Sequence, residues 1–184
     1  MLGDYVLDLG CGKGAWMQVI AQYIHNERRA GVVFGLDINP PSEPSVLCAN
    51  RNVIVQTATC DVLKIEPDSL AKALLKQLRT VSGGSRAALF DSVVSDLSPS
   101  TVGHLGDSLK SLEFAIKAVN IACGVYHDKH RASQPVLRAG GNLLVKLIEG
   151  NGNLATLTES ASILFERCSM VVMHRMCWKY LVCE

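Results

Sequence analysis

The chain has 184 residues and a mass of 19.9 kDa, which is the size of one globular domain and leaves little room for a second core. Hydrophobic residues make up 48% of the chain and charged residues 19%, so the composition excludes intrinsic disorder and indicates a sizeable core. The 18 Lys and Arg residues nearly balance the 17 Asp and Glu residues, which excludes a highly basic nucleic-acid-coating protein but permits a local basic patch.

Cysteine usage and the ends of the chain bear on the compartment. The seven cysteines are scattered, and no two have Cys-x-x-Cys spacing, which argues against a disulfide framework or a structural zinc site and favours a reducing compartment. No stretch approaches the roughly 20 apolar residues of a membrane span. The first residues show neither a signal peptide nor a transit segment, because a strand-like run begins almost at once.

Short apolar runs alternate with helical periodicity along most of the chain. In chain order, the expected elements are a strand at 5–9, a helix at 14–26, strands at 32–38 and 52–57, a helix at 67–80, a strand at 87–96, a helix at 106–125, a strand at 141–148 and a helix at 153–167. The expected helices have apolar residues three and four positions apart. This alternation is typical of a mostly parallel α/β sheet covered by helices on both faces, and we expect a single domain over residues 1–184.

The C-terminal part breaks this alternation. Strand-like runs at 170–174 and 178–183 are separated by too few residues for a crossover helix, which predicts an antiparallel hairpin. The expected loops lie at 39–44, 82–85, 98–106 and 126–141.

The segment from Asp8 to Gly14, Asp-Leu-Gly-Cys-Gly-Lys-Gly, closes the first strand and opens the first helix. Glycines there allow a tight turn and bring backbone N–H groups close to a ligand. Asp37 ends the second strand about 20 residues further on, where a carboxylate can accept both ribose hydroxyls of a bound adenosine. NAD and S-adenosylmethionine both contain such a ribose, and the spacing of Gly10, Gly12 and Ala15 also satisfies the looser dinucleotide pattern.

Three features favour S-adenosylmethionine. Asp8 lies where a carboxylate would face the cationic amino-acid end of that cofactor but would repel a pyrophosphate. Asp61 follows the third strand-like run, where it could bind the adenine amino group; the C-terminal hairpin is the third feature. Each aspartate alone is equally consistent with a turn or helix-cap residue. Their joint placement at successive strand ends favours a ligand site, because open α/β sheets bind ligands there.

Three stretches together carry a family resemblance. They are Asp8 to Gln18, which includes Trp16 two residues after Gly14, the run Ser95-Asp96-Leu97-Ser98-Pro99, and the lysine-ended run 137–146. With these, nearly the whole chain resembles the FtsJ/RrmJ-type ribosomal RNA 2′-O-methyltransferases. The resemblance implies a Rossmann-like, seven-stranded S-adenosylmethionine-dependent methyltransferase fold. The candidate cofactor-binding residues are then Asp8, Gly10, Gly12, Gly14, Trp16, Asp37, Asp61 and Asp96.

In that family, chemistry is assigned to two lysines, an aspartate and a glutamate around the target ribose. Asp96 and Lys146 match the aspartate and the second lysine, and the resemblance implies that Lys146 is the base and that Asp96 orients it. The family's first lysine comes from a helix before the first strand and has no counterpart here. Trp178 occupies the place of the glutamate before the run Tyr180-Leu181-Val182, and neither Glu149 nor Glu184 is assigned to that role.

A ribosomal RNA substrate requires contacts to phosphates, so positive charge should gather at the mouth of the pocket. The candidate RNA-binding residues are Lys13, Lys129, Arg131 and Arg138. Compared with the family, residues 126–138 resemble an insertion, which could grip RNA or a protein partner or simply be a solvated connection. Histidine spacing indicates no metal site, and we expect none.

Three functions remain open from the sequence. The first is S-adenosylmethionine-dependent 2′-O-methylation of large-subunit ribosomal RNA, favoured by the four aspartates. The second is a catalytically weakened relative that binds ribosomal RNA and ribosomal proteins as an assembly factor in ribosome biogenesis, favoured by the unmatched lysine and glutamate. The third is a nicotinamide-dependent oxidoreductase, which the hairpin and the Ser-Asp-x-x-Pro run disfavour. We expect no membrane association, and a mitochondrial ribosome is favoured over a cytoplasmic or nuclear one.

Overall fold

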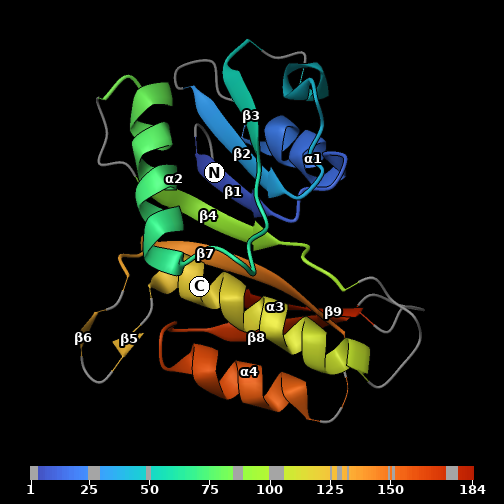
Figure 1. Ribbon diagram of the computed structural model, residues 1–184. Helices are drawn as coiled ribbons and strands as arrows, with labels where there is room; N and C mark the ends of the chain where they lie inside the picture. The colour runs from blue at the N-terminus through green and yellow to red at the C-terminus, as the bar shows by residue number, and fades with distance from the viewer. Residues whose placement is uncertain are drawn as a thin grey trace.

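The computed structural model describes residues 4–24, 30–48, 51–84, 89–99, 106–124, 126–127, 130–131, 133–148, 150, 152–172 and 178–184, with the backbone alone at 126–127, 130–131 and 178. Within these ranges the chain forms one seven-stranded sheet with the strand order β3-β2-β1-β4-β7-β9-β8 (Figure 1). Strands β1 to β4 and β7 pair in parallel, whereas β9 pairs antiparallel with both β7 and β8. The predicted mixed sheet with a C-terminal antiparallel hairpin is therefore confirmed.

Apart from the short strands β5 and β6, which pair antiparallel inside the stretch 126–141 expected to be a loop, the elements alternate along the chain as the sequence predicts. They are β1 (Tyr5–Leu9), α1 (Ala15–Tyr23), β2 (Gly31–Asp37), the 3-10 helix η1 (Pro44–Leu47), β3 (Val53–Thr59), α2 (Pro67–Val81), β4 (Phe90–Ser95), α3 (Gly106–Cys123), β5 (Tyr126–His127), β6 (His130–Arg131), β7 (Leu137–Ile148), α4 (Asn153–Ser162), β8 (Cys168–Val172) and β9 (Trp178–Cys183). None of the helices within the described ranges is both long enough and apolar enough to cross a membrane.

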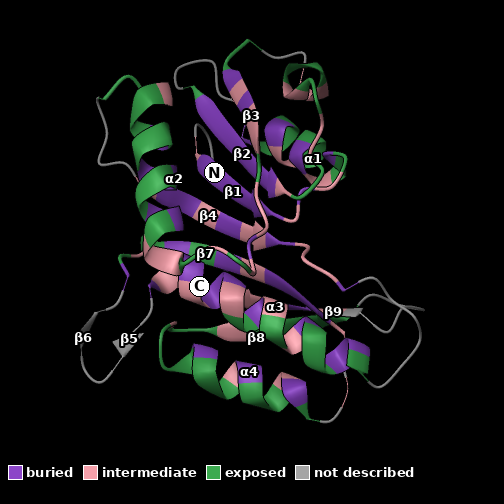
Figure 2. Ribbon diagram, viewed as in Figure 1, coloured by how far each residue is buried: buried purple, intermediate pink, exposed green. Residues whose placement is uncertain are grey.

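Alternating side chains of the central strands divide the core into two parts. In β1, Leu7 and Leu9 pack with the buried faces of α2, α3 and α4, whereas Val6 packs with Met17 and Ala21 of α1. Strands β1, β2 and β4 are buried along most of their length, and the green outer faces of the helices point to solvent (Figure 2). Period-two alternation in the strands and period-3.6 periodicity in the helices thus produce two layers of helix around the sheet.

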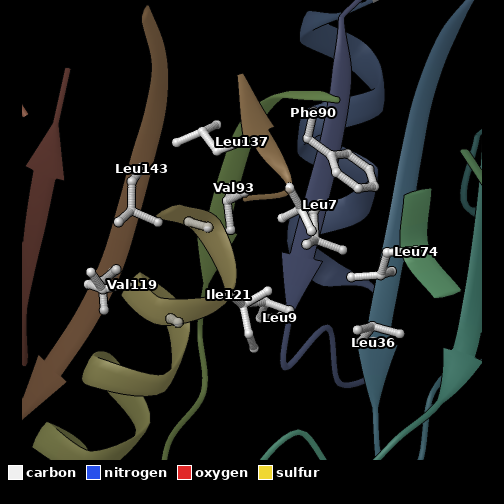
Figure 3. Close-up of a cluster of buried hydrophobic side chains, with 14 of the residues drawn as sticks. Leu7, Leu9, Leu36, Leu74, Phe90, Val93, Val119, Ile121, Leu137 and Leu143 are labelled. Atoms are coloured by element: carbon white, nitrogen blue, oxygen red, sulfur yellow. The ribbon is translucent and has the colours of Figure 1, made fainter. Parts of the chain in front are cut away.

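The larger core lies between the sheet and helices α2 and α3. Figure 3 shows leucines of β1 and β2 meeting Leu74 of α2, while Val119 and Ile121 of α3 face Val93 and Leu143. Most of these side chains are almost completely buried. On the opposite face, α1 contacts β1, β2 and β3, and no described helix covers the same face of β4, β7 and β9.

The beginning of β7 corrects one sequence prediction. Residues 137–141 were expected to end a loop because they contain Gly140-Gly141, but the strand begins at Leu137. Pairing with β4 is irregular there: Leu137 lies opposite Phe90, and Asn142 lies opposite Ser92. The extra residues form an irregularity that the glycines permit, Gly140 having φ of 67°.

The last helix also ends earlier than its apolar pattern suggests. The prediction extended it to 167, whereas α4 ends at Ser162. The chain must reach the sheet edge by Arg167, whose backbone exchanges two hydrogen bonds with Glu184 at 2.9 and 3.2 Å. Tertiary pairing therefore overrides helical periodicity in this segment.

Candidate active site

The candidate site lies where the strand order reverses. From β1 the chain builds outward through β2 and β3, and it then returns to place β4 on the other side of β1. Such a reversal leaves a crevice at the carboxyl ends of the strands. A cavity of about 430 Å³ is found there; it is lined by Gly10, Asp37, Ile38, Cys60, Asp61, Val62, Leu63, Asp96, Leu97, Ser98, Phe114 and Lys146.

The glycine loop forms one wall of this crevice, and two of its glycines are required by geometry. Gly10 has φ of 80°, and a Cβ atom there would lie 2.9 Å from the backbone nitrogen of Leu97. Gly14 has φ of 88°, and a Cβ atom would clash with the side chain of Leu47. Any larger residue would therefore meet both steric overlap and a left-handed backbone that L-residues disfavour.

Asp37 holds the glycine loop in place. Its Oδ2 accepts a hydrogen bond from the backbone N–H of Gly12 at 2.9 Å, and its Oδ1 accepts one from Asn39 at 2.8 Å. Each carboxylate oxygen keeps a further lone pair for a ligand. The residue predicted to accept ribose hydroxyls is thus already oriented by its own neighbourhood, at the rim of the cavity.

Asp8 lies in β1 just before the glycine loop and does not line the cavity, yet it is the most unusual group near the site. Its side chain is 0% exposed, and neither carboxylate oxygen has a hydrogen-bond partner among the described residues. Burial, together with the smaller effect of the negative charges of Asp96 and Asp37, raises its pKa from 3.8 to about 7. A buried polar group without a partner is costly, and a cation brought to this point would compensate it.

Asp96 and Lys146 form the ion pair that the sequence places at the ends of neighbouring strands. The Lys146 Nζ lies 3.0 Å from Asp96 Oδ1, and the lysine side chain is only 6% exposed. The two residues come together because Ser95 and Val145 are register partners in β4 and β7. A charged pair this well buried at the mouth of a cavity is a candidate for chemistry.

Tyr180 completes this group, and the sequence analysis did not single it out. It is the register partner of Lys146 across β7 and β9, and its hydroxyl donates a hydrogen bond to Asp96 Oδ1 at 3.5 Å. Burial raises the pKa of Tyr180 to about 12, so the phenol stays protonated. The available signal is its place in the Tyr180-Leu181-Val182 run, which served only as the landmark for the position of the family's glutamate.

Trp16 lies outside the cavity that holds the candidate aspartates. Its ring packs against Tyr180 with centroids 5.6 Å apart, and it lines a separate apolar groove of about 470 Å³ between α1 and the sheet. The cofactor contact expected of Trp16 stays a prediction, and in the structure the tryptophan packs against the residue that donates to Asp96.

Asp61 occupies the exposed rim of the cavity. Its Oδ1 accepts a hydrogen bond from Leu63 N–H at 3.2 Å, and its Oδ2 lies 3.0 Å from the ammonium of Lys64. That ammonium lowers the pKa of Asp61. Asp61 is thus a turn residue after β3 that also lines the cavity, and its contact with a ligand stays a prediction.

The two proposed basic residues whose side chains the structure describes, Lys13 and Arg138, lie apart. Lys13 is exposed beside the loop after β2, with its Nζ 3.4 Å from the carbonyl oxygen of Asn39, near the cavity. Arg138 lies near the beginning of β7, at the opposite end of the strand from Lys146, and its Nε donates to buried Asp91 Oδ1 at 2.7 Å. Placing Arg138 at the pocket mouth was wrong, because its guanidinium neutralises an internal carboxylate.

The side chains of the other two RNA-binding candidates, Lys129 and Arg131, are not among those that the structure describes. Lys129 lies outside the described residues, and Arg131 is described by its backbone in β6 alone. The same holds for Trp178, whose backbone in β9 pairs with Ile148. Within the described ranges, no group of three or more histidine, cysteine, aspartate or glutamate side chains could hold a metal ion.

The fold has close counterparts among solved structures. A Plasmodium falciparum crystal structure assigned as a ribosomal RNA methyltransferase superposes with a TM-score of 0.67 at 19% identity, covering 100% of this chain and 87% of that one. Human methyltransferase-like protein 13, in complex with SAH, superposes with a TM-score of 0.57 at 15% identity, covering 100% and 72%. At this identity the likeness establishes the fold alone.

Sequence relatives narrow the class. Ribosomal RNA large subunit methyltransferase E of Desulfatibacillum aliphaticivorans is 27% identical over 82% of this chain and 57% of its own length. The protein of the same name from Myxococcus xanthus is 36% identical over 65% of this chain and 47% of its own. The chain therefore spans about half the length of the curated relatives it matches.

The reversal in strand order, the glycine loop and the aspartates at three strand ends define an α/β domain of the methyltransferase class. The FtsJ-like methyltransferase family model matches residues 2–172. The chain belongs to the FtsJ-like methyltransferase family.

Proposed function

We propose that this chain carries out S-adenosylmethionine-dependent 2′-O-methylation of ribose in large-subunit ribosomal RNA. The observation that carries the proposal is the Asp96–Lys146 ion pair, which lies beside the glycine loop in one cavity. Membership of the FtsJ-like family and the names of the relatives support the same reaction and substrate.

The residues at the crevice fit this cofactor. The buried, unpartnered carboxyl of Asp8 suits an ammonium group, because a nearby positive charge would favour the ionised carboxylate that burial disfavours. Asp37 has carboxylate lone pairs free for two ribose hydroxyls, and the cavity extends past it to Asp61 at the adenine end. When bound, the cofactor supplies a methyl group already activated by a sulfonium.

The chain's own residues must then align the ribose hydroxyl and handle its proton. Lys146 Nζ, fixed by Asp96 at 3.0 Å, would accept the 2′-hydroxyl hydrogen while orienting the oxygen for in-line attack. Tyr180 donates to the same Asp96 oxygen and so limits the positions that this carboxylate can take. This proton transfer needs an uncharged amine, and a free lysine is rarely deprotonated at neutral pH.

The last point motivates a second candidate function. The place of the family's glutamate holds Trp178, and Lys146 Nζ lies in an ion pair with Asp96 Oδ1 at 3.0 Å. A chain in this state would bind cofactor and RNA yet transfer methyl groups slowly, as a ribosome assembly factor that contacts ribosomal RNA and ribosomal proteins. The two functions share the pocket and differ in turnover.

Methyl transfer from labelled cofactor to ribosomal RNA or precursor particles tests the reaction. Lys146→Ala and Asp96→Asn should each abolish transfer, whereas the matched surface variants Lys72→Ala and Asp68→Asn, which remove an exposed ion pair of α2, should leave it intact. Unchanged transfer in the first two variants would contradict the catalytic assignment.

Calorimetric titration with S-adenosylmethionine separates the two candidates. The enzyme and the assembly factor both predict binding that Asp37→Ala weakens severely. Binding together with product formation supports the enzyme, and binding without product on any ribosomal RNA precursor supports the assembly factor. A folded wild-type chain that does not bind would contradict the cofactor proposal itself.

We also propose a mitochondrial location and a role in ribosome biogenesis there. The scattered cysteines and the departure from the family pattern at Trp178 support it. Fractionation of cells that express the tagged full-length protein tests this, since recovery in the cytosol or nucleus would contradict it. RNA contacts are proposed for Lys13, Lys129 and Arg131, to be tested by charge reversal and the salt dependence of RNA affinity.

A further inference from the structure

Two cysteines face each other across the C-terminal hairpin. Cys168 at the beginning of β8 and Cys183 at the end of β9 are register partners, and their sulfur atoms lie 3.3 Å apart. Both are free thiols. They are fifteen positions apart in the chain, so only the pairing of the two strands brings them together.

The hydrogen-bond pattern places this pair at a favourable point of the ladder. Arg167 and Glu184, the adjacent register pair, exchange two backbone hydrogen bonds with each other. In an antiparallel ladder the next pair is then a non-hydrogen-bonded one, whose Cα atoms are about 4.5 Å apart and whose side chains are closest. That separation lies within the range of roughly 4.4–6.8 Å found across disulfides.

The two thiols differ in their surroundings. Cys183 is 0% exposed and belongs to the main core, and burial raises its pKa. Cys168 is only partly buried and packs against the edge of that core. The flanking residues Arg167 and Glu184 line a solvent-accessible cavity of about 630 Å³, so a small oxidant can reach this end of the hairpin.

We propose that Cys168 and Cys183 form a reversible disulfide when the protein meets a peroxide. The Cys168 thiolate attacks a peroxide oxygen, which breaks the O–O bond, releases the other oxygen as hydroxide or alkoxide and leaves a sulfenic acid. The Cys183 sulfur then attacks the Cys168 sulfur; the S–O bond breaks, and the departing hydroxide takes the Cys183 proton to give water. The two sulfurs are together oxidised by two electrons, and the peroxide is reduced.

The crosslink would fix β8, the edge strand, to β9. Strand β9 carries Tyr180 three residues before Cys183, so the disulfide would hold the strand that supplies the hydroxyl bonded to Asp96. Closing a loop of this size restricts the unfolded chain, and we expect the unfolding temperature to rise by roughly 5–10 °C. This inference does not depend on the proposed function.

The test treats the whole chain with hydrogen peroxide, blocks remaining thiols with an alkylating agent and maps the peptides by mass spectrometry. The expected result is a Cys168–Cys183 crosslinked peptide, reversed by dithiothreitol, together with the rise in unfolding temperature. Cys168→Ser should abolish both, while the reduced variant unfolds at the temperature of the reduced wild type.

Controls keep the assignment specific. Cys48→Ser and Cys123→Ser should retain the crosslink and the temperature rise, because neither contributes a sulfur to the pair. Recovery of both Cys168 and Cys183 as alkylated thiols after peroxide treatment would overturn the proposal. So would a crosslink from either of them to Cys123, to Cys177 or to a second chain.

Discussion

Replacing Asp8 by asparagine removes a buried ionisable group while keeping the shape of the side chain. The pKa of Asp8 is raised from 3.8 to about 7 in the folded chain, so the folded state keeps its proton over a pH range in which the unfolded state has lost it. Stability from this group is therefore full below pH 4 and falls as pH rises toward 7. The difference of about 3 pH units corresponds to roughly 4 kcal/mol at high pH.

Asparagine stays neutral at every pH, so the variant does not lose this stability as the pH rises. Its amide leaves unpaired donors in the same buried place, at a cost of about 1–3 kcal/mol. At pH 5 the wild type has already lost about 1.7 kcal/mol, so we expect the two proteins to differ there by about 1 kcal/mol or less, and the variant to be up to about 3 kcal/mol more stable at pH 8.5. Denaturant unfolding at both pH values measures the difference, with Asp68→Asn on the exposed face of α2 as the control.

One result would refute this reasoning. If the wild type loses stability between pH 5 and pH 8.5 and Asp8→Asn loses as much, the titrating group lies elsewhere. Cofactor titration adds an independent check, because a neutral amide cannot balance an ammonium. The variant should therefore bind S-adenosylmethionine more weakly at pH 8.5, where its fold is the more stable one.

Three further predictions concern the site and its support. Tyr180→Phe should leave cofactor affinity within about threefold but lower the methyl-transfer rate by roughly tenfold, because Asp96 loses one hydrogen bond of about 1.4 kcal/mol. Steady-state kinetics measure this rate, and an unchanged rate would show that the hydrogen bond does not contribute to methyl transfer. Gly10→Ala should destabilise the fold by about 1–3 kcal/mol and weaken cofactor binding, because its φ is positive and its Cβ meets Leu97; thermal unfolding with ligand titration checks both. Arg138→Ala should lower the free energy of unfolding by about 1–2 kcal/mol, a value reduced because the arginine is partly exposed. RNA affinity in a filter-binding assay should stay unchanged, and a large loss of affinity would show that Arg138 contacts RNA after all.

Local sequence pattern predicts a helix or strand well where the spacing of its apolar residues is regular. Buried strands such as β1 are short apolar runs that end at glycines or aspartates, and α2 has an unbroken apolar stripe from Leu70 to Leu78. The meeting of Asp96 and Lys146 also follows from sequence, because parallel neighbours bring their carboxyl ends to one edge. These features depend on residues that are close in the chain or on a general property of sheets.

Local sequence pattern predicts neither the register of the strands nor the partner that a side chain meets across the sheet. Arg138 reads as a free cation in a basic segment until β4 places Asp91 beneath it. Tyr180 reads as a strand residue until β9 is aligned with Lys146, and Cys168 and Cys183 read as scattered thiols until β8 is added. In each case the deciding contact joins residues far apart in the chain, and a shift of one position would have given a different partner.

The pairing of β7 with β9 restricts the insertions and deletions that this domain can accept in its last strand. Lys146 and Tyr180 share a face because they are direct register partners, and side chains alternate faces along a strand. Adding or deleting one residue between Tyr180 and Cys183 would either unpair the strand end or turn the phenol away from Asp96. Inside β9 even a neutral insertion would therefore separate the Tyr180 hydroxyl from the Asp96 carboxylate to which it donates.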